Sequence, residues 1–250
     1  MIICFSTHKG GTGKTTSSIS LSAGFARTKK RTLLIDMDPQ GHSSLGLGIE
    51  LVYEDQNIAD VLSDRRLPIE QIIRETKVSY LSIAPSNLRL ATESEALYAK
   101  VKREERLGRA LKPIAPQYDW IIIDCPPALG VLTANAVGAA DAVIIPCHMG
   151  ARSLDGLGDL LNLVHILKGE DFTEWRILLT MIDARKSITA DIFQDLLKPY
   201  QPHVLKTQIA TSEALNQAQI AGEDIFAFDP KSKGAQHYDA LTKELLNLYR

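Results

Sequence analysis

Short runs of apolar, often β-branched residues alternate along the chain with segments of helical periodicity. Helices are predicted at residues 15–28, 154–168 and 190–197. Strands that are buried on both faces of a parallel sheet are apolar at nearly every position. Such runs occupy residues 2–6, 32–35, 80–84, 120–123, 142–146, 177–182 and 204–209. The alternation predicts an α/β fold, a three-layer, doubly wound, mostly parallel sheet with helices on both faces.

No linker, repeat or low-complexity tract divides the chain, so residues 1–250 are predicted to form a single domain. Segments 53–75 and 86–109 are more polar and helical, and we expect them to leave the sheet. The charged run 100–106 predicts a solvated helix face, with a nucleic-acid contact as the weaker alternative. In the last predicted helix, 235–250, Tyr238, Leu241, Leu245 and Leu248 form an apolar stripe that indicates core packing.

Composition narrows the class of protein. The 250 residues are 45% apolar and 23% charged, with a formal net charge of −2. A protein that coats nucleic acid with its whole surface is more basic, so DNA contacts would need a local patch or a dimer. Three widely spaced cysteines predict a reducing compartment without a disulfide framework or zinc site. No apolar run reaches the ~18 residues of a membrane span, so the predicted location is cytoplasmic.

The candidate chemistry begins directly after the first predicted strand. Residues 8–16 read His-Lys-Gly-Gly-Thr-Gly-Lys-Thr-Thr. The three glycines let the backbone approach a phosphate, and the helix that follows adds the positive end of its dipole. In such a P-loop, Lys14 reaches the β- and γ-phosphates of ATP and the Thr15 hydroxyl ligates Mg²⁺. The predicted phosphate-binding residues are Lys9, Gly10, Gly11, Thr12, Gly13, Lys14, Thr15 and Thr16. This motif places the chain among P-loop NTPases.

Carboxylates end two other predicted strands. Asp36 and Asp38 follow the strand at 32–35, and Asp124 closes the apolar run at 120–123. In parallel sheets, ligands bind at the carboxyl ends of the strands, so these side chains should face the P-loop. A carboxylate there can orient water or a hydrated Mg²⁺. Asp124 matches the Walker B pattern, in which the aspartate holds Mg²⁺ through water. Cys125 is expected to be a packed thiol.

These motifs together resemble the ParA/MinD family, whose deviant Walker A loop carries a second lysine, here Lys9. Residues 36–41 resemble its switch I and residues 124–130 its switch II. Strings at 135–141, 155–157, 180–185 and 229–235 extend the resemblance over nearly the whole chain, closest to Soj-like ParA partition ATPases. The resemblance implies a Mg²⁺-dependent ATPase with Lys9, Lys14 and Asp38 as catalytic residues. Lys9 would contact the partner subunit's nucleotide, Asp38 would position water, and Thr15, Asp36 and Asp124 would serve the metal.

The resemblance also implies partners. ParA proteins form ATP-bound homodimers that bind nucleoid DNA without sequence preference, and a ParB-like protein stimulates hydrolysis. The chain would then segregate or position plasmid or chromosome cargo, without contacting a membrane. Met181 and Ile209 would border the adenine. Arg185 matches a DNA-contacting family position, and Lys186, Lys206, Lys231 and Lys233 could add phosphate contacts. The family often has Ile-Pro-Arg where this chain has Ile209-Ala210-Thr211, so one arginine associated with DNA is missing.

Two other classes of function remain open at this point. The nucleotide could switch a scaffold that carries a non-DNA cargo, such as a protein cluster or organelle. Alternatively, the chain could be a small-molecule kinase, or an electron carrier like nitrogenase reductase. The electron carrier would need cysteines that share an iron–sulfur cluster between subunits, and only Cys125 and Cys147 are remotely placed for it.

Overall fold

The computed structural model describes residues 1–148, 156–182 and 195–249. It contains one eight-stranded sheet with the order β3-β4-β2-β5-β1-β6-β7-β8. All neighbouring strands pair in parallel except β3 and β4, which are antiparallel. The strands are β1 (Ile2–Phe5), β2 (Thr32–Asp36), β3 (Arg74–Glu75), β4 (Leu81–Ala84), β5 (Trp120–Asp124), β6 (Ala142–His148), β7 (Trp175–Ile182) and β8 (Val204–Ala210). The predicted α/β fold with a mostly parallel sheet is confirmed.

Every run predicted to be a strand is a strand, with small shifts at the ends. The difference is β3, which lies inside the segment that was expected to leave the sheet. Its two residues pair with Ile83 and Ser82 of β4 and form the antiparallel edge. So short a strand has no apolar run of its own, and only tertiary pairing defines it.

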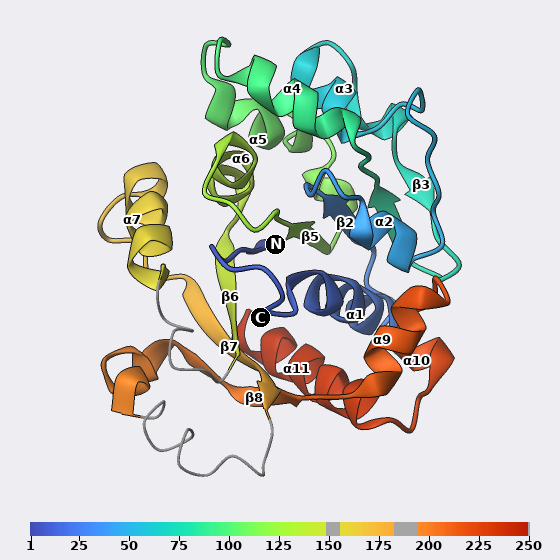
Figure 1. Ribbon diagram of the computed structural model, residues 1–250, viewed down its shortest axis with the longest axis vertical. Coiled ribbons are helices and arrows are strands. Elements are labelled where there is room, and N and C mark those ends of the chain that lie inside the picture. Colours follow the sequence, from blue (N-terminus) through green and yellow to red (C-terminus); the bar gives the residue numbers. More distant parts are fainter. Residues whose placement is uncertain (149–155, 183–194, 250) are drawn as a thin grey trace.

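Helices cover both faces of the sheet (Figure 1). They are α1 (Lys14–Arg27), α2 (His42–Gly46), α3 (Ile58–Ser63), α4 (Arg89–Leu97), α5 (Arg106–Leu111), α6 (Val131–Ala139), α7 (Leu157–Lys168), α9 (Glu213–Ile220), α10 (Ile225–Phe228) and α11 (Lys233–Leu248). One apolar core lies between the sheet and α3 to α7. The other lies between the sheet and α1, α9, α10 and α11. The predicted helix at 190–197 falls largely outside the described residues.

Two sequence expectations about helix faces hold only in part. Tyr238, Leu241 and Leu245 are buried in the second core as predicted, but Leu248 is 44% exposed because α11 ends there. The charged run 100–106 is mostly exposed, as a solvated face should be, but Arg106 is not. It is 7% exposed and donates hydrogen bonds to backbone oxygens at the end of α3. Its burial depends on tertiary packing that no local pattern encodes.

Helix α11 packs against α1, the helix that starts at the P-loop, and holds it in place. The Ser17 and Tyr238 hydroxyls lie 2.9 Å apart in a buried hydrogen bond. About two turns further along α1, Gly24 lets the two helices approach closely. A Cβ added at Gly24 would lie 2.1 Å from Oγ1 of Thr242, a distance that real structures essentially never show. The Thr242 hydroxyl is itself held by a hydrogen bond to the Tyr238 carbonyl oxygen.

Replacing Gly24 by alanine should therefore destabilise the protein, although alanine is the better helix former. Overpacking of this kind costs about 1–3 kcal/mol in the free energy of unfolding. Gly158 of α7 is the matched control, because a Cβ there meets nothing within 4 Å. Gly158→Ala should be neutral or stabilise by up to about 1 kcal/mol. Urea unfolding measures both variants.

The double variant Gly24→Ala/Thr242→Ala removes the clashing hydroxyl and should recover part of the lost stability. If Gly24→Ala unfolds at the same urea concentration as the wild type, the tight α1–α11 contact is wrong.

Candidate active site

Parallel pairing brings three strand ends to the same level at one edge of the sheet. Phe5, the last residue of β1, is in register with Asp124 of β5. Asp36, the last residue of β2, is also in register with Asp124. The loop that follows β1 therefore starts beside two carboxylates. This is the arrangement expected for ligand binding in a parallel α/β sheet.

The glycine-rich loop between β1 and α1 has the backbone of an anion cradle. Gly11 and Gly13 have positive φ values of 68° and 82°, which favour glycine. A Cβ added at Gly11 would meet nothing within 4 Å, so the loop faces open space there. Gly13 is the N-cap of α1, and no side chain caps this helix. The first N–H groups of α1 are therefore available for an anion, as at phosphate-binding helix termini.

The predicted lysines take different positions. Lys14 is buried, and its ammonium donates a hydrogen bond to the Lys9 carbonyl oxygen at 3.1 Å. Burial lowers the pKa of Lys14, and the neighbouring Asp124 carboxylate is the strongest opposing influence. Lys9 is half-buried and is not among the residues that line the cavity described next. Lys14 therefore lies at this chain's own cavity, whereas Lys9 does not line it.

An open cavity of about 620 Å³ lies above the loop and is large enough for a nucleotide. It is lined by Gly10, Gly11, Thr12, Gly13, Lys14, Thr15, Thr16, Asp38, Pro39, Gln40, His42, Ala91, Pro127 and Met181. The predicted P-loop residues other than Lys9 thus meet Asp38 and Met181. Ile209, the other residue expected beside the adenine, is 3% exposed and packs in the core against α11 instead.

Asp36 and Asp124 lie beneath this cavity, fully buried. Asp124 accepts hydrogen bonds from the hydroxyls of Ser18 at 3.1 Å and Ser43 at 2.7 Å. The Thr15 hydroxyl is also close enough to lower the pKa of the Asp124 carboxyl. These hydroxyls come from α1 and α2, so the carboxylate ties both helices to the end of β5.

The second carboxylate fixes the segment that carries Asp38. One oxygen of Asp36 accepts hydrogen bonds from the backbone N–H and the hydroxyl of Ser44, at 2.9 and 2.8 Å. The other accepts the Asp38 backbone N–H at 3.1 Å. Asp38 in turn accepts the Gln40 N–H at 2.9 Å, which closes a turn. Asp36 therefore acts on the cavity through Asp38, whose own carboxylate lines it.

When two neighbouring carboxylates are buried away from water, ionising both of them costs free energy in the folded protein. Burial is the main cause that raises the pKa of Asp36 to about 7, and the Asp124 charge acts in the same direction. Burial also raises the pKa of Asp124 to about 6, against the hydroxyls of Ser43 and Thr15 and the charge of Lys14. Cationic charge at the cavity would lower both values.

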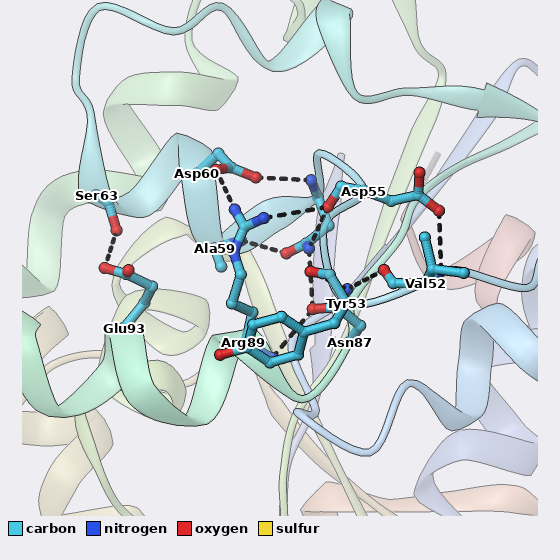
Figure 2. A network of polar contacts seen from close by, with 10 residues as sticks. Val52, Tyr53, Asp55, Ala59, Asp60, Ser63, Asn87, Arg89 and Glu93 are labelled. Atoms are coloured by element: carbon cyan, nitrogen blue, oxygen red, sulfur yellow. Dashed lines mark hydrogen bonds and ion pairs between the residues drawn. The ribbon is translucent and has the colours of Figure 1, made fainter.

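The far wall of the cavity contains Ala91 of α4, and a polar network holds the start of this helix (Figure 2). Arg89 forms an ion pair with Asp60 of α3. The Asn87 amide donates to the Val52 carbonyl oxygen at 2.8 Å and accepts from the Asn57 amide at 3.0 Å. Segments far apart in sequence are joined at this wall, so α4 is a firm boundary of the cavity.

The donor chemistry suits Mg²⁺ that arrives with a nucleotide. No group of three or more His, Cys, Asp or Glu side chains within the described ranges could hold a metal by itself. Mg²⁺ usually takes one or two protein oxygens and completes its shell with phosphates and waters. Thr15 can supply a hydroxyl oxygen, and Asp124 behind it can accept hydrogen bonds from metal-bound water. The buried Thr12 hydroxyl, which has no hydrogen-bond partner in the part of the chain described, adds a donor at the phosphate loop.

The serines that hydrogen-bond to the two carboxylates were not predicted from the sequence. Ser43 and Ser44 follow Gly41 at the start of α2, and Ser18 lies one turn after Lys14 on α1. Hydroxyl residues clustered beside glycine-rich turns are a signal that could have singled them out. Ala91 had no such signal, because only the tertiary network brings α4 to the cavity.

Lys206, Lys231 and Lys233, three of the candidate DNA-contacting residues, do not line this cavity. Lys206 is exposed on the edge strand β8, and Lys231 and Lys233 are exposed at the start of α11. Arg185 and Lys186 lie outside the described residues. No helix in the described part of the chain is long and apolar enough to cross a membrane.

Comparison with known proteins agrees with this geometry. Residues 1–177 match the sequence model of a family described as an AAA domain. The chain is 41% identical over 98% of its length to the sporulation initiation inhibitor protein Soj of Bacillus subtilis, of which it covers 97%. It is 39% identical, again over 98% of its length, to the chromosome partitioning protein ParA of Myxococcus xanthus, of which it covers 87%.

Solved structures share the fold over nearly the whole chain. Cobyrinic acid a,c-diamide synthase from Mycobacterium smegmatis, with a bound ATP analogue and magnesium, aligns with a TM-score of 0.85 at 28% identity. The alignment covers 99% of this chain and 95% of that one. The septum site-determining protein MinD from Pyrococcus horikoshii, complexed with Mg-ADP, aligns with a TM-score of 0.79 at 23% identity, over 99% and 96% of the two chains.

The raised pKa values predict how stability depends on pH in the nucleotide-free protein. Folded Asp36 binds its proton up to about pH 7, whereas an unfolded aspartate releases it near pH 4. Its contribution to stability is therefore present below about pH 4 and is lost as the pH rises through 7. Between pH 5 and 7 the free energy of unfolding should fall by on the order of 2 kcal/mol. Urea unfolding at several pH values measures this, and Asp36→Asn should flatten the slope. A wild type equally stable at both pH values contradicts the prediction.

Proposed function

Because the chain belongs to the ParA/MinD family of P-loop ATPases, we propose that it is a ParA-type, Mg²⁺-dependent ATP hydrolase that segregates or positions plasmid or chromosome cargo. It would dimerise when ATP is bound, bind nucleoid DNA without sequence preference, and be stimulated by a ParB-like partner. The observation that carries the proposal is the P-loop with two lysines, of which Lys14 lines the cavity and Lys9 does not.

Hydrolysis converts ATP and water into ADP and phosphate, and charge develops on the transferred phosphoryl oxygens. The backbone N–H groups of the loop and the Lys14 ammonium stabilise that charge. Bound Mg²⁺, held by Thr15 and by water on Asp124, would neutralise part of it. Asp38 lines the cavity together with the loop and is the residue we assign to orienting the attacking water.

Lys9 completes the site of the neighbouring subunit in this proposal. A second cation at the phosphoryl oxygens, supplied from another chain, acts like an arginine finger. Hydrolysis is then slow in the monomer, because one catalytic charge is absent until two ATP-bound subunits meet. Dimerisation and hydrolysis are thereby coupled through a single side chain.

DNA contact rests on local charge, since the net charge of the chain is −2. Lys206 of β8 and Lys233, the first residue of α11, are exposed, as is Lys231 just before α11. The elements β8 and α11 pack against each other. Phosphate contacts by such lysines carry no sequence information, which fits binding without sequence preference. The protein would then be cytoplasmic and associated with the nucleoid. Thr211, at the position of a family arginine, favours a second candidate function, the positioning of a non-DNA protein cargo.

The variant Lys9→Ala distinguishes the proposed role of Lys9 from that of Lys14. The variant should still bind ATP through Lys14, but it should lose ATP-dependent dimerisation and at least about 100-fold of its stimulated phosphate release. Analytical ultracentrifugation with and without ATP measures the dimer, and Lys100→Ala, an exposed lysine away from the loop, is the control. A Lys9→Ala protein that dimerises and hydrolyses ATP like the wild type would refute the trans-lysine proposal.

The DNA contact is tested by an electrophoretic mobility shift on random-sequence duplex at several salt concentrations. With ATP, binding should weaken steeply between about 50 and 200 mM salt, because phosphate contacts release counterions. The triple variant Lys206→Ala/Lys231→Ala/Lys233→Ala should bind more weakly and lose about one unit of salt slope per contacting lysine. Lys77→Ala/Lys100→Ala/Lys112→Ala changes the net charge equally and should bind like the wild type. No ATP-dependent shift in the wild type would favour the non-DNA cargo.

A further inference from the structure

A second cavity lies on the α3–α5 side of the molecule, at the top of Figure 1, and shares no lining residue with the nucleotide cavity. It measures about 500 Å³ and lies between the segment that follows α3 and the helix α5. Part of its wall is apolar, with Val61, Leu67, Ile69 and Ala110. Apolar walls with a few convergent polar groups are typical of small-molecule sites.

The polar groups at this cavity are mostly guanidinium groups. Arg65, Arg66, Arg106 and Arg109 line it, and Glu70 is the one carboxylate in the lining. Two other acids reach the arginines from outside the lining. Glu105 holds Arg109 at 2.6 Å, and Asp64 lies 3.4 Å from Arg66. The cavity keeps an excess of positive charge after these pairs are counted.

Arg106 is the innermost of the four, at 7% exposed. Its Nη1 donates to the backbone oxygens of Leu62 at 2.5 Å and Ser63 at 3.0 Å, which caps the end of α3. Its Nε is buried and has no hydrogen-bond acceptor among the described residues. No carboxylate of that part of the chain pairs with Arg106, and the charges of Arg65 and Arg109 join burial in lowering its pKa.

A buried cation is ordinarily paired, and one that faces other cations instead costs stability. An anion in the cavity would relieve that cost. Several guanidinium groups around one position favour a phosphate, which can carry two negative charges and accept several N–H groups at once. The apolar wall fits an organic group joined to that phosphate. A concave site with its key arginine buried suits a small ligand better than the convex backbone of duplex DNA.

We propose that this cavity binds a phosphate monoester with an apolar or aromatic group, whose phosphate is held by Arg65, Arg106 and Arg109. The Arg106 guanidinium keeps its cap on α3 through Nη1 and offers Nη2 to the ligand. Arg65, which follows α3 and also donates to the Val101 carbonyl oxygen, and Arg109 of α5 supply the other two guanidinium groups. The organic group lies on Leu67 and Ile69. This site is independent of ATP hydrolysis and of the proposed cargo function.

The test is calorimetric titration with phenyl phosphate and, separately, with inorganic phosphate. Both use protein saturated with Mg-ADP, so that the P-loop is occupied. Phenyl phosphate should bind more tightly than inorganic phosphate because the wall contributes. Equal affinities for the two compounds would contradict the part of the proposal that concerns the organic group. If neither compound binds up to about 10 mM, which corresponds to a binding free energy near −3 kcal/mol, the whole proposal is overturned.

Variants locate the site. Arg106→Gln and Arg109→Gln should each weaken phenyl phosphate binding by roughly tenfold or more, since each removes a charge-assisted contact. Arg109 is 45% exposed, so its variant keeps the test valid if loss of the α3 cap unfolds Arg106→Gln. Arg103→Gln is the matched control, because Arg103 is a nearby arginine that contacts Tyr98 and does not line the cavity.

An equal loss in Arg103→Gln would mean that the binding is unspecific charge attraction. Short duplex DNA that displaced phenyl phosphate from wild-type protein but not from Arg109→Gln would assign these arginines to nucleic acid instead, and would also overturn the proposal.

Discussion

The site depends on one constraint, the parallel register that sets Asp36 level with Asp124 and Asp124 level with Phe5. Two carboxylates are thereby buried side by side at the point where the chain leaves β1 for the P-loop. Such a pair is tolerated only because hydroxyl and N–H groups surround it. Ser18 and Ser43 supply hydroxyls to Asp124, and Ser44 supplies both its hydroxyl and its N–H to Asp36. The hydrogen bonds that stabilise the carboxylates therefore also place α1 and α2.

This arrangement connects the state of the cavity to the positions of the surrounding segments. Asp36 fixes the backbone at Asp38, and the Ser44 hydroxyl that binds Asp36 also accepts the Ser86 N–H at 3.1 Å. Ser86 precedes Asn87, whose amide holds the loop at Val52 (Figure 2). Hydrogen bonds, together with the Ser86–Asn87 peptide bond, thus connect Asp36 to the far wall of the cavity. A change in the ionisation of Asp36 would act first on its hydrogen bonds to Ser44 and to the Asp38 backbone.

The parts of the molecule that could be predicted from sequence are those encoded locally. Strands buried on both faces need continuous apolar runs, so each of the predicted runs was found in the sheet. The P-loop needs glycines and a lysine at fixed spacing, so its cradle was predictable as well. By contrast, β3 has two residues and exists through its pairing with Ser82 and Ile83. Ala91 reaches the cavity only because Arg89 and Asn87 anchor α4, and no local pattern predicts that. The side chain of Ile209 on β8 is buried in the second core and does not line the cavity.

The difference between local sequence pattern and tertiary contact also explains why Arg106 was predicted to be solvated. A run of alternating charges ordinarily forms an exposed helix face, and its neighbours Arg103 and Glu105 are exposed as expected. Arg106 differs because α5 begins there and packs against α3, whose last carbonyl groups need donors. Capping by a guanidinium satisfies those carbonyl oxygens but brings a charge into the protein that no described carboxylate neutralises. A neutral donor could cap α3 equally well without the cost of a buried charge. Because Arg106 stands in that place beside an open cavity, we assign an anion to the cavity.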